Sequence, residues 1–284
     1  MQTRSEQRCF GGTIGFYSHQ SEELALEASF GVFIPDGATP DARRPALYAL
    51  AGLTSTADTF ATKSGILRFA AEHGLAVVFP DTSPRGAGIP GEDEDWDFGT
   101  GAGFYLNATE APWSAHYRMG SYVNNELPSF VEQHFPVSSD RRGITGHSMG
   151  GHGALTLGLR DPARWQSISA LAPICHPAVV PWGQKAFERY LGSNHNAWAF
   201  HDAVLLFGAG QRHPREILVD QGEADQFLTE QLLPDALERA AAAVGQSLTL
   251  RRHPGYDHSY WFIQGVIGDH VAHHARILNP LNLR

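Results

Sequence analysis

The feature that most constrains this chain is its alternation of short apolar segments with longer segments of helical spacing. Strands are predicted for the apolar segments 46–52, 75–81, 141–147, 165–173, 215–222 and 246–255. Helices are predicted for the segments 59–74, 117–135, 150–162, 227–245 and 259–278. This alternation is typical of βαβ units, which build a mostly parallel sheet with helices on both faces.

The beginning of the chain differs, because it contains strand-like segments without helical spacing. Segments 8–18 and 26–35 predict antiparallel strands, paired as a hairpin or meander at one edge of the sheet. No repeat or low-complexity linker interrupts the chain, so residues 1–284 are expected to form a single α/β domain. In such sheets ligands bind beyond the carboxyl ends of the strands, so catalytic side chains are expected just after strands.

Charge and cysteine content exclude several classes of function. The formal net charge is −9, which argues against nucleic acid and anionic membranes as partners, because both require clustered Lys and Arg. Cys9 and Cys175 lie in no metal-ligand spacing and are expected to be thiols in a reducing compartment. The N-terminus lacks the apolar segment of a signal peptide, and no run of 18 apolar residues occurs. A cytoplasmic enzyme acting on a small molecule is therefore expected.

A candidate nucleophile lies where a predicted strand meets a predicted helix. Gly146-His147-Ser148-Met149-Gly150 matches the G-x-S-x-G pattern, in which the serine occupies a strained turn and its neighbours two positions away must be small. Gly151 and Gly153 are expected to let the following helix pack closely on the sheet. The N-terminus of that helix also favours developing negative charge. The alternative interpretation is a structural Gly-rich turn that happens to contain a serine.

A serine hydroxyl needs a base and a group that orients the base, and in folds with this turn both follow the serine along the chain. His258 is the preferred base, because it lies in a Pro- and Gly-containing loop directly before a predicted helix. His253, at the end of the preceding strand, is the alternative. His270 and His274 have an i,i+4 spacing that could ligate a metal, but a solvated helix face is the favoured interpretation.

Two carboxylates compete for the role of the acid. Asp220 lies at the end of a predicted strand, and Asp225 lies in the turn that follows. Asp225 is favoured, although it could equally be the N-cap of the next helix. Both roles are compatible, since a carboxylate has several acceptor sites. Asp257, beside the histidine, is interpreted as a turn residue.

An oxyanion formed during acyl transfer requires two N–H donors. One is expected from Met149, the residue after the candidate nucleophile. The other is expected from Leu53, in the loop after the strand at 46–52, where Gly52 gives the backbone conformational freedom. Only the backbone N–H takes part, so an apolar side chain at Leu53 is compatible with this role.

The segment 83–113 is acidic, aromatic and without clear periodicity. A calcium-binding loop aligned from Asp93 would need Gly at position 98 and Glu at position 104, but Phe stands at both. Trp96, Phe98, Phe104 and Tyr105 would be costly to leave in water. The segment is therefore expected to pack as a cover over one rim of the site, rather than to form a solvated surface loop.

The motifs together resemble the S-formylglutathione hydrolase (esterase D) family of α/β-hydrolases. The similar stretches cover nearly the whole chain: GLTSTADTF, GEDEDWDFGTGAGFYLNAT, GHSMGGHGAL, APICHPAVVPWGQKAFERYLG, DQGEADQFL and GYDHSYWFI. The resemblance implies a thioesterase that splits S-formylglutathione into glutathione and formate, with side activity on short-chain esters. Carried over by position, it implies Ser148, Asp225 and His258 as the triad and Leu53 and Met149 as oxyanion donors.

The resemblance also implies a homodimer and no metal or organic cofactor. Trp182 is a candidate wall of the acyl pocket, with plain core packing as the alternative. The family often has Cys where this chain has Ser55, in the oxyanion loop. That thiol is outside the triad, so hydrolysis is expected to survive its absence. A general carboxylesterase for small acyl groups, a catalytically inactive binding protein and an acyltransferase are the competing interpretations.

Overall fold

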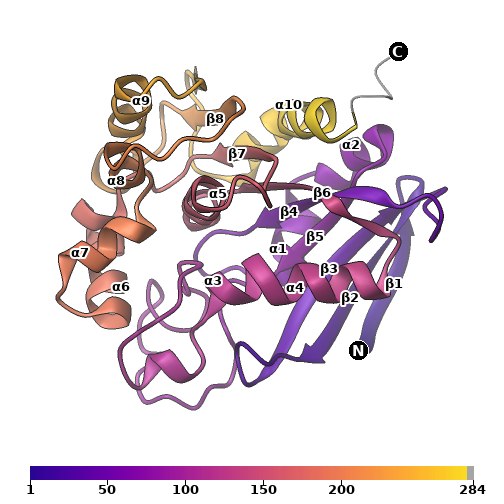
Figure 1. Cartoon of the computed structure of the whole chain (residues 1–284), viewed down its shortest axis with the longest axis horizontal. Helices are drawn as coiled ribbons and strands as arrows, with labels where there is room; N and C mark the ends of the chain where they lie inside the picture. The colour runs from indigo at the N-terminus through magenta and orange to yellow at the C-terminus, as the bar shows by residue number, and fades with distance from the viewer. Residues whose placement is uncertain (280–284) are drawn as a thin grey trace.

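The computed structural model describes residues 1–279, which are built around one nine-stranded sheet (Figure 1). The strand order is β1-β2-β3-β5-β4-β6-β7-β8-β9. The strands are β1 (Gln2–Cys9), β2 (Gly12–Gln20), β3 (Glu27–Pro35), β4 (Arg44–Leu50), β5 (Ala76–Pro80), β6 (Val137–Gly146), β7 (Ser167–Leu171), β8 (Ile217–Gly222) and β9 (Leu248–His253). From β5 to β9 all neighbouring pairs are parallel.

The N-terminal edge of the sheet is an antiparallel meander. β1 pairs with β2, β2 with β3 and β3 with β5, all antiparallel. Phe10 and Gly11 join the first two strands with φ of 48° and 71°, the left-handed pair that a tight hairpin turn requires. The α/β fold class, with a mostly parallel sheet and antiparallel N-terminal strands, is confirmed. The meander begins earlier than expected, because β1 covers residues 2–9.

Helices cover both faces of the sheet. Figure 1 shows α2 (Ile66–His73) and α10 (Tyr260–Leu278) on one side of the sheet and α4 (Leu127–His134) on the other. The remaining α-helices are α1 (Ala57–Lys63), α3 (Met119–Ser121), α5 (Met149–Arg160), α6 (Pro181–Leu191), α7 (His195–Trp198), α8 (Ala203–Gly208) and α9 (Pro234–Ala243). β5, β7 and β8 are buried at every position, as expected for strands covered on both faces.

The strand order creates a crevice at the carboxyl ends of β4 and β6. After β4 the chain crosses to β5 on one side, whereas after β6 it crosses to β7 on the other side. Adjacent parallel strands whose connections leave in opposite directions open a space between their following loops. The loop after β4 begins at Ala51, and Ser148 lies two residues after β6 ends. The topology therefore brings the candidate oxyanion loop and the candidate nucleophile together.

Three predicted helices are divided in the structure. The segment 117–135 forms α3, a π-helical stretch (Tyr122–Glu126) and α4. The segment 59–74 forms α1 and α2, because Gly65 has a φ of 74° and interrupts the helix. The segment 227–245 forms a π-helical turn (Leu228–Leu232) and then α9, separated by Leu233 with a φ of 51°. The helices α6, α7 and α8, between residues 181 and 208, were not predicted from periodicity.

The expected solvated face of the C-terminal helix is wrong. His270 and His274 are completely buried, and both point to partners on the sheet. His274 bonds to the hydroxyls of Ser167 and Ser169 at 2.6 and 2.8 Å, and His270 Nε2 lies 3.2 Å from Asp220 Oδ2. Both nitrogens of His274 and Nε2 of His270 are thus satisfied by hydrogen bonds, the usual requirement for a polar group inside a core, whereas Nδ1 of His270 has no partner among the described residues.

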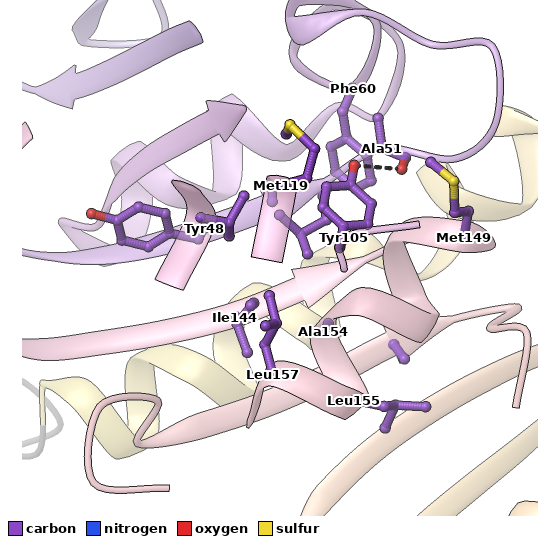
Figure 2. Close-up of a cluster of buried hydrophobic side chains, with 14 of the residues drawn as sticks. Tyr48, Ala51, Phe60, Tyr105, Met119, Ile144, Met149, Ala154, Leu155 and Leu157 are labelled. Atoms are coloured by element: carbon purple, nitrogen blue, oxygen red, sulfur yellow. Dashed lines mark hydrogen bonds between the residues drawn. The ribbon is translucent and has the colours of Figure 1, made fainter. Parts of the chain in front are cut away.

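The acidic segment between β5 and α3 packs against the core, but one of its aromatic residues does not. Phe98, Phe104 and Tyr105 are buried, whereas Trp96 is 59% exposed. Figure 2 shows Tyr105 within the hydrophobic cluster, where its hydroxyl donates a hydrogen bond of 2.8 Å to the carbonyl of Ala51. The segment is thus anchored next to the loop that follows β4.

Candidate active site

Ser148 lies in a strained turn between β6 and α5. Its φ of 58° and ψ of −118° fall in a region that residues with a side chain rarely occupy. A β-carbon on Gly146 would lie 2.2 Å from the carbonyl oxygen of Gly150, and one on Gly150 would lie 2.1 Å from that of Leu50. Both distances are impossible for non-bonded atoms, so this turn admits only glycine at these two positions.

Gly151 packs on both a loop and the end of β6, since a β-carbon there would lie 2.9 Å from Pro173 and also 3.1 Å from the carbonyl oxygen of Gly146. A β-carbon on Gly153 would lie 2.7 Å from the ring of Tyr105. Close packing on the sheet also occurs at Gly158, where a β-carbon would lie 2.4 Å from Ile168 of β7. The expected close packing on the sheet therefore applies to Gly151, whereas Gly153 makes room for the ring of Tyr105 instead.

Asp225 and His258 are joined by a short hydrogen bond. Nδ1 of His258 lies 2.6 Å from Oδ2 of Asp225. The Asp225 side chain is fully buried, and that of His258 is 11% exposed. Oδ2 also accepts from the Gln221 amide at 3.1 Å, while Oδ1 accepts from the backbone N–H of Phe227 at 2.8 Å. One carboxylate thus orients the imidazole and stabilises the turn ahead of the next helix.

Ser148 and His258 line one pocket of about 330 Å³. The pocket lies beyond the carboxyl ends of β4 and β6, where the strand order predicts a ligand site. Within residues 1–279 no hydrogen bond joins the Ser148 hydroxyl to the imidazole.

The alternative acid and base lie elsewhere. Asp220 is buried and is held by Arg251, whose Nε lies 2.6 Å from Oδ1, and by His270. Burial raises its pKa, but the hydrogen bonds from His270 and Arg251 outweigh burial and lower it below the usual value. His253 faces the same carboxylate, at 3.4 Å, and not the pocket. Asp257 accepts from the backbone N–H of Ser259 at 2.9 Å, as a turn residue would.

The two expected oxyanion donors flank Ser148. Leu53 and Gly52 line the pocket on one side of the serine, and Met149 follows it at the first position of α5. A β-carbon on Gly52 would lie 3.1 Å from the Ser148 β-carbon, so the loop after β4 passes close to the serine. Among the described residues, the backbone N–H groups of Leu53 and Met149 have no acceptor. Two free donors therefore border the serine, as an oxyanion site requires.

Aromatic side chains form the walls of the pocket. Trp182 contacts Trp96 edge-on, with ring centroids 5.6 Å apart, and lies 4.7 Å from the ring of Phe227. Both tryptophans and Phe227 line the pocket, as does Ser55. Trp96 thus covers the rim while remaining exposed, which explains why it is the unburied aromatic of its segment.

Neither periodicity nor spacing identified several residues of the pocket. Thr54, Thr59, Lys63, His147 and Tyr260 line it as well. The ring of His147 lies 4.5 Å from that of His258. Burial, with the adjacent His258, lowers the pKa of His147 well below its usual value, so this ring stays neutral. Its position inside the G-x-S-x-G motif was the one available clue.

Both cysteines are free thiols. Cys175 is completely buried, and burial raises the pKa of its thiol well above the usual value. Cys9 is partly buried and is the last residue of β1. Neither lines the pocket.

Residues 1–279 contain no group of three or more His, Cys, Asp or Glu side chains placed to hold a metal ion. Within the same residues, no helix has the length and apolar character needed to cross a membrane.

The fold and the pocket together define a serine hydrolase of the α/β class, and comparison with known proteins agrees. The model of the family "Esterase" matches residues 21–274. S-formylglutathione hydrolase of Mus musculus is 50% identical over 97% of this chain and 98% of its own. That of Paracoccus denitrificans is 49% identical over 98% of both chains. The solved structure of an S-formylglutathione hydrolase from Agrobacterium tumefaciens is 47% identical, with a TM-score of 0.95 over 98% of this chain and all of that chain. The chain belongs to the S-formylglutathione hydrolase family.

Proposed function

We propose that this chain is a serine thioesterase that hydrolyses S-formylglutathione to glutathione and formate, with Ser148, Asp225 and His258 as its catalytic triad. The observation that carries the proposal is the His258–Asp225 hydrogen bond, formed beside a serine in the strained turn of one pocket. The relatives named S-formylglutathione hydrolase, at 47–50% identity over nearly the whole chain, support the choice of substrate.

The proposed reaction begins when His258 takes the proton of Ser148 as the serine oxygen attacks the formyl carbon. The backbone N–H groups of Leu53 and Met149 stabilise the oxyanion of the tetrahedral intermediate. The carbon–sulfur bond then breaks, and the protonated imidazole returns its proton to the departing sulfur, which releases glutathione. Water, deprotonated by His258, then attacks the formyl-enzyme. The ester bond to Ser148 breaks, the imidazolium returns the proton to the serine oxygen, and formate leaves. Asp225 holds the imidazole in place throughout.

Lys63 places a positive charge in the pocket, where it can bind the anionic glutathione moiety of the substrate. Its ammonium lies 5.9 Å from the Tyr260 ring centroid. Among the described residues it forms no ion pair, and it is the pocket's one Lys or Arg. The glutathione moiety carries two carboxylates and one ammonium, so a cation at the rim favours it in a chain of net charge −9.

The second candidate is a general carboxylesterase for small acyl groups, favoured by the apolar walls at Trp96, Trp182 and Phe227. A panel of formyl, acetyl and longer thioesters of glutathione, with the matching p-nitrophenyl esters, separates the two. We expect the highest kcat/KM on S-formylglutathione, and a higher value on a p-nitrophenyl ester would favour the second candidate.

The Ser148→Ala variant tests the nucleophile. Its turnover should fall about 10⁴-fold or more, and a fluorophosphonate probe should label the wild-type chain at Ser148 alone. Rates in the variant close to those of the wild type would refute the assignment.

The biological setting forms part of the same proposal. Hydrolysis of S-formylglutathione would be the hydrolytic step of formaldehyde detoxification, and a cytoplasmic location fits the two unpaired thiols. We propose one catalytic domain over residues 1–284, of which 280–284 lie outside the described residues, and a homodimer. The homodimer rests on the resemblance to the family, and the single domain rests on the lack of a repeat or low-complexity linker in the sequence.

A further inference from the structure

The segment Ala51–Ser55, here called the oxyanion turn, contains the Leu53 N–H and follows β4 directly. We propose that Tyr105 is a positioning residue that holds this turn in its catalytic conformation. The inference rests on the proposed function, because it concerns where the Leu53 donor lies relative to Ser148. Tyr105 itself does not line the pocket, so its effect on the reaction must pass through the backbone it contacts.

The Tyr105 hydroxyl donates to the carbonyl of Ala51, two residues before Leu53, at 2.8 Å (Figure 2). The tyrosine is 1% exposed. Inside a core a hydrogen bond of this kind is costly to leave unmade, since water cannot replace it. The bond therefore restrains the amino-terminal side of the oxyanion turn.

The backbone conformation at Tyr105 and the residue that its ring packs against are both unusual. Phe104 and Tyr105 both have left-handed backbone conformations, with φ of 49° and 50°, which residues with a side chain seldom adopt. The ring packs where Gly153 has no side chain, since a β-carbon there would lie 2.7 Å from ring atom Cδ2. Gly153 belongs to α5, the helix that begins directly after Ser148. The same ring thus contacts the nucleophile's helix and the oxyanion turn, and fixes their relative position.

The carboxyl-terminal side of the oxyanion turn is restrained separately. The Ser55 carbonyl accepts from Thr82 Oγ1 at 2.5 Å and from Arg85 Nη2 at 2.8 Å. The Thr54 N–H donates to the Gly101 carbonyl at 3.0 Å. The turn is therefore held on both sides of Leu53, while the Leu53 N–H itself stays free. Such a preorganised donor stabilises a developing oxyanion without reorganisation during the reaction.

Tyr105→Phe removes one hydroxyl and leaves the ring in place. We expect kcat on S-formylglutathione to fall roughly tenfold with KM changed less than twofold, below the 10²–10³-fold loss that follows removal of an oxyanion donor itself. The affinity of a trifluoromethyl ketone, which forms a tetrahedral adduct with the serine, should fall by the same factor as kcat/KM. A merely structural role would lower the unfolding temperature without this matched loss.

Tyr122→Phe is the matched control, because it removes another buried tyrosine hydroxyl, which bonds to His19 Nε2 at 3.1 Å and makes no hydrogen bond to the turn. It should leave kcat and ketone affinity unchanged. Thr82→Val removes a restraint on the other side of the turn and provides the test if Tyr105→Phe does not fold. It should lower kcat in the same way.

Wild-type kcat and ketone affinity in Tyr105→Phe, or an equal loss in Tyr122→Phe, would overturn the inference alone. Retained turnover in Ser148→Ala would instead overturn the proposed function on which it rests.

Discussion

His258 Nδ1 lies 2.6 Å from Asp225 Oδ2, although the two residues come from separate loops after β9 and β8. We expect Asp225→Asn to fold normally and to lose about 10³–10⁴-fold in kcat/KM, because an amide can donate to Nδ1 and fix the wrong imidazole tautomer. Steady-state kinetics on S-formylglutathione, with circular dichroism as the check on folding, measure this.

Asp220→Asn is the matched control at the competing carboxylate. It leaves Arg251 and His270 without their buried partner. It should lower the free energy of unfolding by about 2 kcal/mol, less than for a fully buried pair because the Arg251 side chain is 33% exposed. Its kcat should stay near the wild-type value. A larger loss of kcat in Asp220→Asn than in Asp225→Asn would show that Asp220, and not Asp225, orients the catalytic imidazole.

The steric argument for the serine turn predicts a sharp contrast between two glycines. Gly146→Ala places a β-carbon 2.2 Å from the Gly150 carbonyl oxygen, so the turn must distort and activity should fall below about 1%. Gly208→Ala, at the end of α8, meets no atom within 4 Å and should change stability by less than about 1 kcal/mol. Kinetics and urea unfolding of both variants check this, and near-normal kcat in Gly146→Ala would contradict it.

The proposed binding of the anionic glutathione moiety by Lys63 predicts that replacing this lysine changes KM more than kcat. Lys63→Gln should raise KM for S-formylglutathione about 3- to 10-fold, with little change in kcat or in the hydrolysis of p-nitrophenyl acetate, which is uncharged. Arg68→Gln removes the same charge from an exposed residue of α2 outside this pocket and should leave both substrates unaffected. Equal changes on both substrates in Lys63→Gln would show that charge recognition is not involved.

Thiol reagents should leave activity intact, since the chain has Ser55 in the oxyanion turn. Cys175 is buried with a raised pKa, so its reactive thiolate is scarce and inaccessible. Cys9 lies on β1, away from the pocket. Incubation with iodoacetamide, followed by mass spectrometry and an assay, should show alkylation at Cys9 at most and near-complete activity. Strong inactivation would place a reactive thiol close to the serine.

Buried histidines predict that stability falls in mild acid. Burial lowers the pKa of His152 and of His273 to about 4, whereas in the unfolded chain the value is the ordinary 6.5. The unfolded state therefore binds more protons as pH falls from 6.5 towards 4. Across this window the free energy of unfolding should fall, by up to about 1.4 kcal/mol per pH unit for each histidine. Urea unfolding at pH 7.5, 6 and 5 measures the slope, and equal stability at these pH values would contradict it.

Sequence alone determined the features that depend on local sterics and on order along the chain. The glycines around Ser148 predicted a strained turn, because a backbone conformation of that kind excludes side chains at Gly146 and Gly150. Apolar alternation predicted the parallel strands, and short strands joined by helices leave few other arrangements. These predictions needed no knowledge of contacts between distant residues.

Tertiary structure decided what depends on which strands become neighbours. Placing β8 between β7 and β9 buries Asp220 beside Arg251 and His270, and leaves Asp225 to meet His258. The same packing buries His270 and His274, although their spacing also suits a solvated helix face. Periodicity describes one element at a time, whereas burial and pairing of polar groups arise where several elements meet. Trp182 is a candidate wall from the sequence alone, whereas the other pocket walls and the restraint on the oxyanion turn depend on the folded chain.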